Sequence, residues 1–132
     1  MPEEIQPDPK PLRTAKIYHN PRCSKSRATL SVLQDHGIEI EVIQYLEMTP
    51  NPRELQELCR LLGVSPTAIV RSKESRFEEL GLSMKDKRTE EEWCRILSEN
   101  PMLIERPIVR IGDRAVIGRP PENVLKLLGP DS

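Results

Sequence analysis

The sequence predicts an α/β domain in which a mixed four-stranded sheet carries inserted helices between a β-α-β half and a β-β-α half. Three observations predict this fold. The first part of the chain has a strand, helix and strand pattern, the centre has only helical periodicity, and the last part holds a tight hairpin followed by a helix. Strands joined through a helix run parallel and hairpin strands run antiparallel, so one sheet containing both pairs is mixed.

The β-α-β half begins with a strand at residues 15–18 and a turn at residues 19–23. A helix is expected from about Ser24 to the stop at Gly37, with an apolar face made of Ala28, Val32 and Leu33. Residues 38–42 then alternate between β-branched apolar residues and glutamate, which is typical of a half-buried strand.

Two helices in the centre have clear start signals. The first covers residues 52–62, because Asn51 can cap it and its apolar residues recur at helical spacing: Leu55, Leu58, Cys59 and Leu62. The second begins at Thr89, forms a capping box with Glu92 and ends at Asn100. Less regular elements are expected between them, namely helices at residues 66–70 and 74–80 and a charged connection at residues 84–88.

The β-β-α half begins with strands at residues 108–111 and 115–117, which flank the turn pair Gly112-Asp113. A last helix starts at Pro121. This order of elements is the thioredoxin-like arrangement with helices inserted before its second half.

The chain of 132 residues leaves room for one domain, which we assign to residues 14–129. Residues 1–13 carry four of the 13 prolines and almost no apolar side chains, so we expect a disordered tail.

Composition excludes several functions. The 20 Lys and Arg residues nearly balance the 21 Asp and Glu residues, which removes a general electrostatic reason to bind nucleic acid or an anionic membrane. Aromatic residues make up only 3% of the chain, too few for a base-stacking platform. The chain has no apolar run long enough to span a membrane and no secretory signal, so we expect a cytoplasmic protein.

The chemically most informative segment is the turn that ends at Cys23. This position puts the thiol at the start of a helix, where free backbone N–H groups and the helix dipole favour the thiolate. Basic residues surround it in sequence: His19, Arg22, Lys25 and Arg27. Such neighbours disfavour the alternative of a structural cysteine in the core. We therefore predict that Cys23 is a nucleophile.

The remaining cysteine positions narrow the chemistry. Ser26 stands where a dithiol oxidoreductase has its second cysteine, so a thiol from outside must release whatever Cys23 attacks. Thr29 replaces the arginine of a phosphatase loop, which disfavours phosphatase chemistry. Cys59 is expected to pack in the core and Cys94 to be a half-exposed bystander. Three widely spaced cysteines fit neither a disulfide framework nor a metal site, so no metal is expected.

Three arginines lie at the ends of apolar segments, where side chains reach the rim of a sheet: Arg71, Arg106 and Arg119. Each alone is an ordinary surface charge. Together they could hold a tetrahedral oxyanion beside a thiolate through bidentate hydrogen bonds. Pro107 enters a strand directly after a turn, a place where a cis peptide bond can occur.

These segments resemble the glutathione/glutaredoxin-dependent arsenate reductase family over roughly residues 15–128. The resemblance rests on residues 17–27 around Cys23, residues 45–47, Arg71, residues 106–109 and residues 118–120. It implies that Cys23 attacks arsenate and that His19 helps to keep the thiol ionised. It also implies that the three arginines named above hold arsenate and stabilise the product. Further residues of the matching segments are expected to support the site: Asn20, Ser26, Arg27 and Pro107.

The resemblance also implies the reductants. Glutathione would attack the arsenic adduct as a co-substrate, glutaredoxin would remove the glutathione and arsenite would leave, with no bound cofactor. Two other classes compete with arsenate reduction. A redox-responsive transcriptional regulator that binds RNA polymerase would need a second thiol where Ser26 stands, and a monothiol glutaredoxin-like or glutathione-transfer enzyme would not need three rim arginines.

Overall fold

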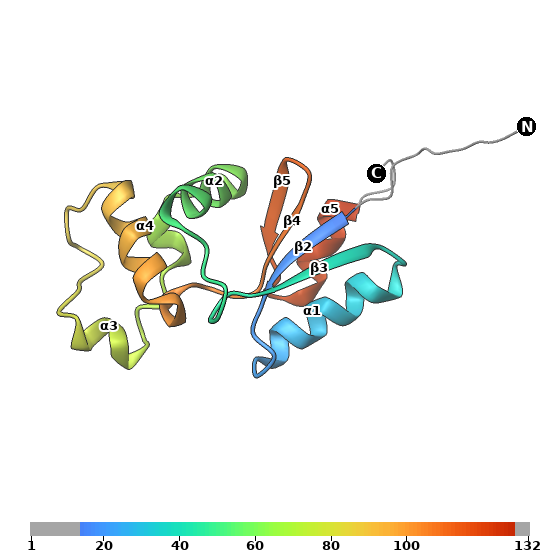
Figure 1. The fold of residues 1–132 in the computed structure, drawn as a ribbon, viewed down its shortest axis with the longest axis horizontal. Helices are drawn as coiled ribbons and strands as arrows, with labels where there is room; N and C mark the ends of the chain where they lie inside the picture. The colour runs from blue at the N-terminus through green and yellow to red at the C-terminus, as the bar shows by residue number, and fades with distance from the viewer. Residues whose placement is uncertain (1–13, 129–132) are drawn as a thin grey trace, which may run out of the picture.

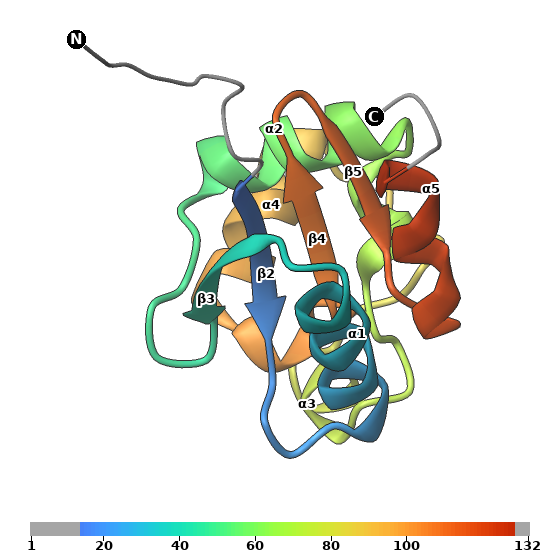
Figure 2. The ribbon, with the colours of Figure 1, turned by 90° about the vertical axis from the view of Figure 1, so that its right-hand side faces the viewer.

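The computed structural model describes residues 14–128, so the expected tail and residue 129 of the assigned domain lie outside the described residues. Its four-stranded sheet has the order β3-β2-β4-β5 (Figure 2). The strands are β2 (Thr14–His19), β3 (Glu39–Gln44), β4 (Ile108–Ile111) and β5 (Arg114–Ile117). The β2–β3 pair is parallel and the pairs β2–β4 and β4–β5 are antiparallel, which confirms the predicted mixed sheet.

Helices cover both faces of the sheet (Figure 1). On one face lie α1 (Ser24–Asp35) and the short α5 (Leu125–Leu128). On the other lie α2 (Pro52–Leu62), α3 (Ser75–Glu79) and α4 (Glu90–Glu99). Each side has its own apolar core: one includes Ile17, Leu33, Val109 and Val124, and the other includes Leu55, Leu58, Trp93, Leu97 and Leu103.

The predicted helix ends are confirmed where a local signal marks them. The Asn51 side chain accepts a hydrogen bond of 2.8 Å from the Glu54 N–H at the start of α2, and Gly63 ends that helix with φ of 74°. Thr89 and Glu92 form the capping box of α4. Short 3₁₀ helices complete the chain: η1 (Pro66–Ile69), η2 (Pro101–Leu103) and η3 (Pro121–Val124).

Two expectations about burial are wrong. Ala28 is exposed, because α1 turns Ser26, Thr29 and Leu33 toward the protein instead. Cys94 is fully buried rather than half-exposed, because α4 is packed between α2, η1 and η2 and so buries more than one face. Within the described residues, no helix is long and apolar enough to cross a membrane.

Candidate active site

Cys23 lies at the junction of β2 and α1, as the sequence predicts. It is the N-cap residue of the 12-residue α1, and its side chain is 7% exposed. The Cys23 N–H donates to the Asn20 carbonyl at 2.9 Å, and the Cys23 carbonyl accepts from the Arg27 N–H at 3.0 Å. These bonds hold Cys23 at the positive end of the helix dipole.

His19 and Ser26 form the inner support of this turn. The Ser26 hydroxyl lies 2.7 Å from His19 Nδ1 and accepts a hydrogen bond of 3.0 Å from the Asn20 N–H. Arg27 closes the turn from outside by donating to the Pro21 carbonyl at 2.8 Å. Burial, and then the positive charge of Arg27, lower the pKa of His19, so its imidazole is neutral near pH 7. The hydrogen bond between His19 Nδ1 and the Ser26 hydroxyl orients the turn around the thiol.

Arg119 is the arginine that contacts the Cys23 sulfur. Its Nη2 lies 3.7 Å from Cys23 Sγ, and its Nε donates to the Arg106 carbonyl at 2.8 Å. The same Nε lies 3.3 Å from a carboxylate oxygen of Glu105. A guanidinium held at Nε and aimed with Nη2 at the sulfur stabilises negative charge on that sulfur.

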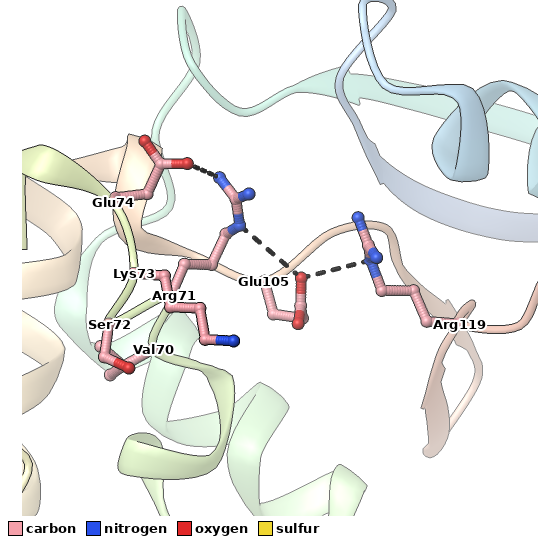
Figure 3. Close-up of a pocket in the computed structure, with 7 residues that line it drawn as sticks. All are labelled: Val70, Arg71, Ser72, Lys73, Glu74, Glu105 and Arg119. Atoms are coloured by element: carbon pink, nitrogen blue, oxygen red, sulfur yellow. Dashed lines mark ion pairs between the residues drawn. The ribbon is translucent and has the colours of Figure 1, made fainter.

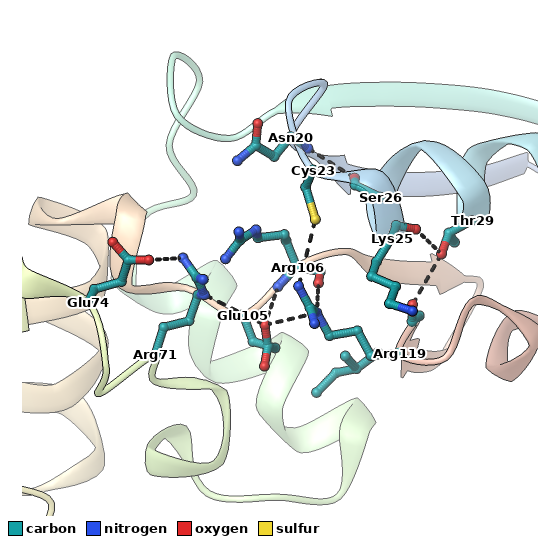
Figure 4. Close-up of polar contacts among 12 residues, drawn as sticks. Asn20, Cys23, Lys25, Ser26, Thr29, Arg71, Glu74, Glu105, Arg106 and Arg119 are labelled. Atoms are coloured by element: carbon teal, nitrogen blue, oxygen red, sulfur yellow. Dashed lines mark hydrogen bonds and ion pairs between the residues drawn. The ribbon is translucent and has the colours of Figure 1, made fainter.

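Arg106 carries buried donors that lack acceptors. Its Nε and Nη1 are both buried, and neither has a hydrogen-bond partner within residues 14–128. In Figure 4 its side chain lies in the space between Cys23 and Arg71. Buried donors are almost always paired, so a guanidinium with two nitrogens unpaired among the described residues indicates a place where an anion can bind.

Arg71 lies across the same space and belongs to a cavity of about 560 Å³ that it lines with Lys73, Glu105 and Arg119 (Figure 3). Its Nη1 pairs with Glu74 at 2.5 Å, and its Nε lies 3.9 Å from Glu105. Two of the predicted arginines, Arg71 and Arg119, therefore line this cavity, and Arg106 lies between Arg71 and Cys23 (Figure 4).

A tight junction behind the cavity fixes two of these arginines. The peptide bonds Arg106-Pro107 and Arg119-Pro120 are both cis, which confirms the expectation for Pro107. Gly118, which precedes Arg119, donates its N–H to the Pro107 carbonyl at 2.9 Å, and its own carbonyl accepts from the Thr29 hydroxyl at 3.2 Å. A Cβ at Gly118 would lie 2.6 Å from that hydroxyl oxygen, so only glycine allows this close approach.

Two residues of the site were not assigned a role from the sequence. Glu105 bridges the arginines, although the sequence shows it only as the neighbour of Arg106. Tyr45 is 1% exposed, and its burial raises its pKa to about 12 despite the nearby charge of Arg71. Its hydroxyl is therefore protonated at working pH. Only the resemblance of residues 45–47 could have indicated Tyr45, because no local pattern connects it to Cys23.

The other two cysteines are unsuited to nucleophilic chemistry. Burial raises the pKa of Cys59 to about 12 and that of Cys94 to about 11, so both remain thiols. Across residues 14–128, no group of three or more His, Cys, Asp or Glu side chains is arranged to hold a metal ion. Of the three cysteines, Cys23 is the one that contacts an arginine of the cavity, through Arg119 Nη2.

Several known proteins are similar to this chain in sequence and fold over most of its length. The ArsC family matches residues 18–127. The chain is 45% identical over 118 residues to the uncharacterized protein YfgD of Escherichia coli K12, covering 89% of this chain and 98% of that protein. It is 43% identical over 113 residues to the arsenate reductase of Haemophilus influenzae Rd, covering 85% and 97%. The solved structure of the arsenate reductase from Vibrio cholerae matches with a TM-score of 0.83 and 43% identity, covering 88% and 98%.

Proposed function

Because this chain belongs to the ArsC family, we propose that it reduces arsenate to arsenite through Cys23, with glutathione and glutaredoxin as the external reductants. One observation carries the proposal. The sulfur of Cys23 lies 3.7 Å from an Arg119 guanidinium nitrogen, beside two buried Arg106 donors that have no partner among the described residues. This arrangement suits a reaction between a thiolate and an oxyanion, because fixed donors offset the repulsion between them.

The first step joins the protein to arsenic. The Cys23 thiolate attacks arsenic, the sulfur–arsenic bond forms, and one arsenic–oxygen bond breaks. The departing oxygen takes up protons and leaves as water, while arsenic stays pentavalent. Arg106 and Arg119 donate hydrogen bonds to the remaining oxygens, which carry the developing negative charge.

The reducing steps need two further thiols. Glutathione displaces a second oxygen as water, so arsenic is bound to two sulfurs. A glutaredoxin thiolate then attacks the glutathione sulfur, a disulfide forms, and the electron pair of the broken sulfur–arsenic bond stays on arsenic, which becomes trivalent. Water replaces the Cys23 sulfur on arsenic, and arsenite leaves with Cys23 restored.

The other cysteines support a reductant from outside the chain. Ser26 lies three residues after Cys23 and bonds to His19, so it offers no second thiol. Cys59 and Cys94 are 3% and 0% exposed and belong to the core formed around α2 and α4, which does not include Cys23. This supports the release of an adduct on Cys23 by a thiol that diffuses in.

The test is arsenate-dependent oxidation of NADPH in the presence of glutathione, glutathione reductase and glutaredoxin. The wild-type protein should turn over arsenate, and Cys23→Ser should not. Cys59→Ala is the matched control and should keep turnover. Leaving out glutaredoxin should stop the reaction. If the protein exchanges a small disulfide with glutathione but never consumes arsenate, it is a monothiol glutaredoxin-like enzyme instead.

A further inference from the structure

Glu105 places a negative charge in the cavity that it lines with Arg71 and Arg119, the second of which reaches Cys23. Its carboxylate lies 3.3 Å from Arg119 Nε and 3.9 Å from Arg71 Nε, between the two guanidiniums (Figure 3). The same carboxylate accepts a hydrogen bond of 3.1 Å from the Arg106 N–H. The Glu105 carboxylate thus contacts each of the three segments that supply Arg71, Arg106 and Arg119.

The contacts of Glu105 leave Nη2 of Arg119 for another partner, while Nη1 of Arg71 is paired with Glu74. Both ion pairs are made through Nε, and Nη2 of Arg119 remains directed at Cys23 Sγ. The Nε and Nη1 of Arg106 face the site without a partner among residues 14–128. Glu105 therefore orients the arginines without filling the position beside the sulfur (Figure 4).

Glu105 also sets the net charge that a ligand meets. The cavity is lined by three cations and two carboxylates, namely Arg71, Lys73, Arg119, Glu74 and Glu105, which sum to one positive charge. Arg106, which lies between Arg71 and Cys23, adds one positive charge, and the negative charge that the proposed function puts on the Cys23 sulfur offsets it. A site with one surplus positive charge is neutralised by an oxyanion with one negative charge, and a second negative charge on the ligand would face Glu105 without compensation.

We propose that Glu105 is a built-in counter-anion that makes this site select singly charged tetrahedral oxyanions over doubly charged ones. The inference deepens the proposed function, because it states the charge of the arsenate species that the site accepts. For arsenate, it assigns dihydrogen arsenate, which carries two protons and one negative charge, as the substrate. Removing the Glu105 charge leaves a surplus of two positive charges and shifts the preference toward dianions.

The test compares perchlorate with sulfate, which share a tetrahedral shape but differ by one charge. Each anion is titrated for its ability to protect Cys23 from iodoacetamide, measured by mass spectrometry of the peptide that contains it. The wild-type protein should bind perchlorate more tightly than sulfate. In Glu105→Gln, the sulfate-to-perchlorate ratio of binding constants should rise about tenfold, which equals a difference of about 1.4 kcal/mol.

Two further variants separate charge selection from a structural role. Glu105→Ala should raise the ratio as Glu105→Gln does, while both anions bind more weakly because the arginines lose an anchor. Glu57→Gln removes an equal charge from a pair with Arg60 outside the site and should leave the ratio unchanged. An unchanged ratio in both Glu105 variants overturns the proposal, and so does tighter binding of sulfate than of perchlorate by the wild type, or a failure of perchlorate to protect Cys23. Neither result requires arsenate turnover, so the proposed function is judged separately by the coupled assay.

Discussion

Replacing Arg106 with methionine should make the protein more stable and less active. The Nε and Nη1 of Arg106 are buried without partners within residues 14–128. An unsatisfied buried donor costs about 1–3 kcal/mol, and more when it is charged. Methionine keeps much of the length of the side chain but carries no donor. We therefore expect Arg106→Met to raise the free energy of unfolding by about 1–3 kcal/mol.

The same substitution should lower kcat/KM for arsenate by about 10²–10³-fold, the usual effect of losing one donor to a developing oxyanion. Urea unfolding followed by circular dichroism gives the stability, and the coupled assay gives the rate. Arg95→Met, at an exposed arginine on α4, is the control and should shift the unfolding free energy by less than about 0.5 kcal/mol. A destabilised Arg106→Met, or one with wild-type kcat/KM, would refute the argument that these donors are held ready for an anion.

Further outcomes follow from the packing and titration of the site. Gly118→Ala should destabilise the protein by about 1–3 kcal/mol and lower arsenate turnover, because its Cβ would lie 2.6 Å from Thr29 Oγ1. Adding Thr29→Ala should recover part of the lost unfolding free energy, measured by urea unfolding. If the effects of the two substitutions are fully additive, the two residues do not clash. Cys59→Ala and Cys94→Ala should keep arsenate turnover, since burial holds both as thiols; a folded variant without activity would reveal a missed internal thiol. Because the pKa of His19 is lower in the folded protein than its ordinary value of 6.5, the unfolded chain binds a proton at this residue more readily than the folded protein does. The stability that His19 contributes is therefore present above pH 6.5 and declines as the pH falls below 6.5. Urea unfolding at about pH 7 and about pH 5 should therefore show a steeper loss for the wild type than for His19→Gln, and equal losses would contradict the sign.

Local signals explain which parts of the fold could be predicted from the sequence. The α2 and α4 helices start at side-chain caps, and Gly112 with φ of 61° makes the β4–β5 turn, so each boundary depends on neighbouring residues only. The exposure of Ala28 and the burial of Cys94 depend instead on which elements pack against α1 and α4. Periodicity within one helix does not contain that information.

The candidate site divides in the same way. Cys23 was found because a thiol between a strand and a basic helix start has a local signature, and the arginines because each ends an apolar segment. Glu105 gains its role only when the segments of Arg71 and Arg119 meet in space at 3.9 Å and 3.3 Å from its carboxylate. Three segments distant in sequence must be placed together before a bridging carboxylate can be recognised.

The bond between Cys23 and arsenic tests the central claim most directly. X-ray absorption at the arsenic edge, recorded on the protein mixed with arsenate in the absence of glutathione, distinguishes sulfur from oxygen neighbours and reports the oxidation state. We expect pentavalent arsenic with one sulfur neighbour in the wild-type protein and only oxygen neighbours in Cys23→Ser. Arsenic surrounded by oxygen alone in the wild type, or a sulfur neighbour that persists in Cys23→Ser, would contradict the assignment of Cys23 as the nucleophile.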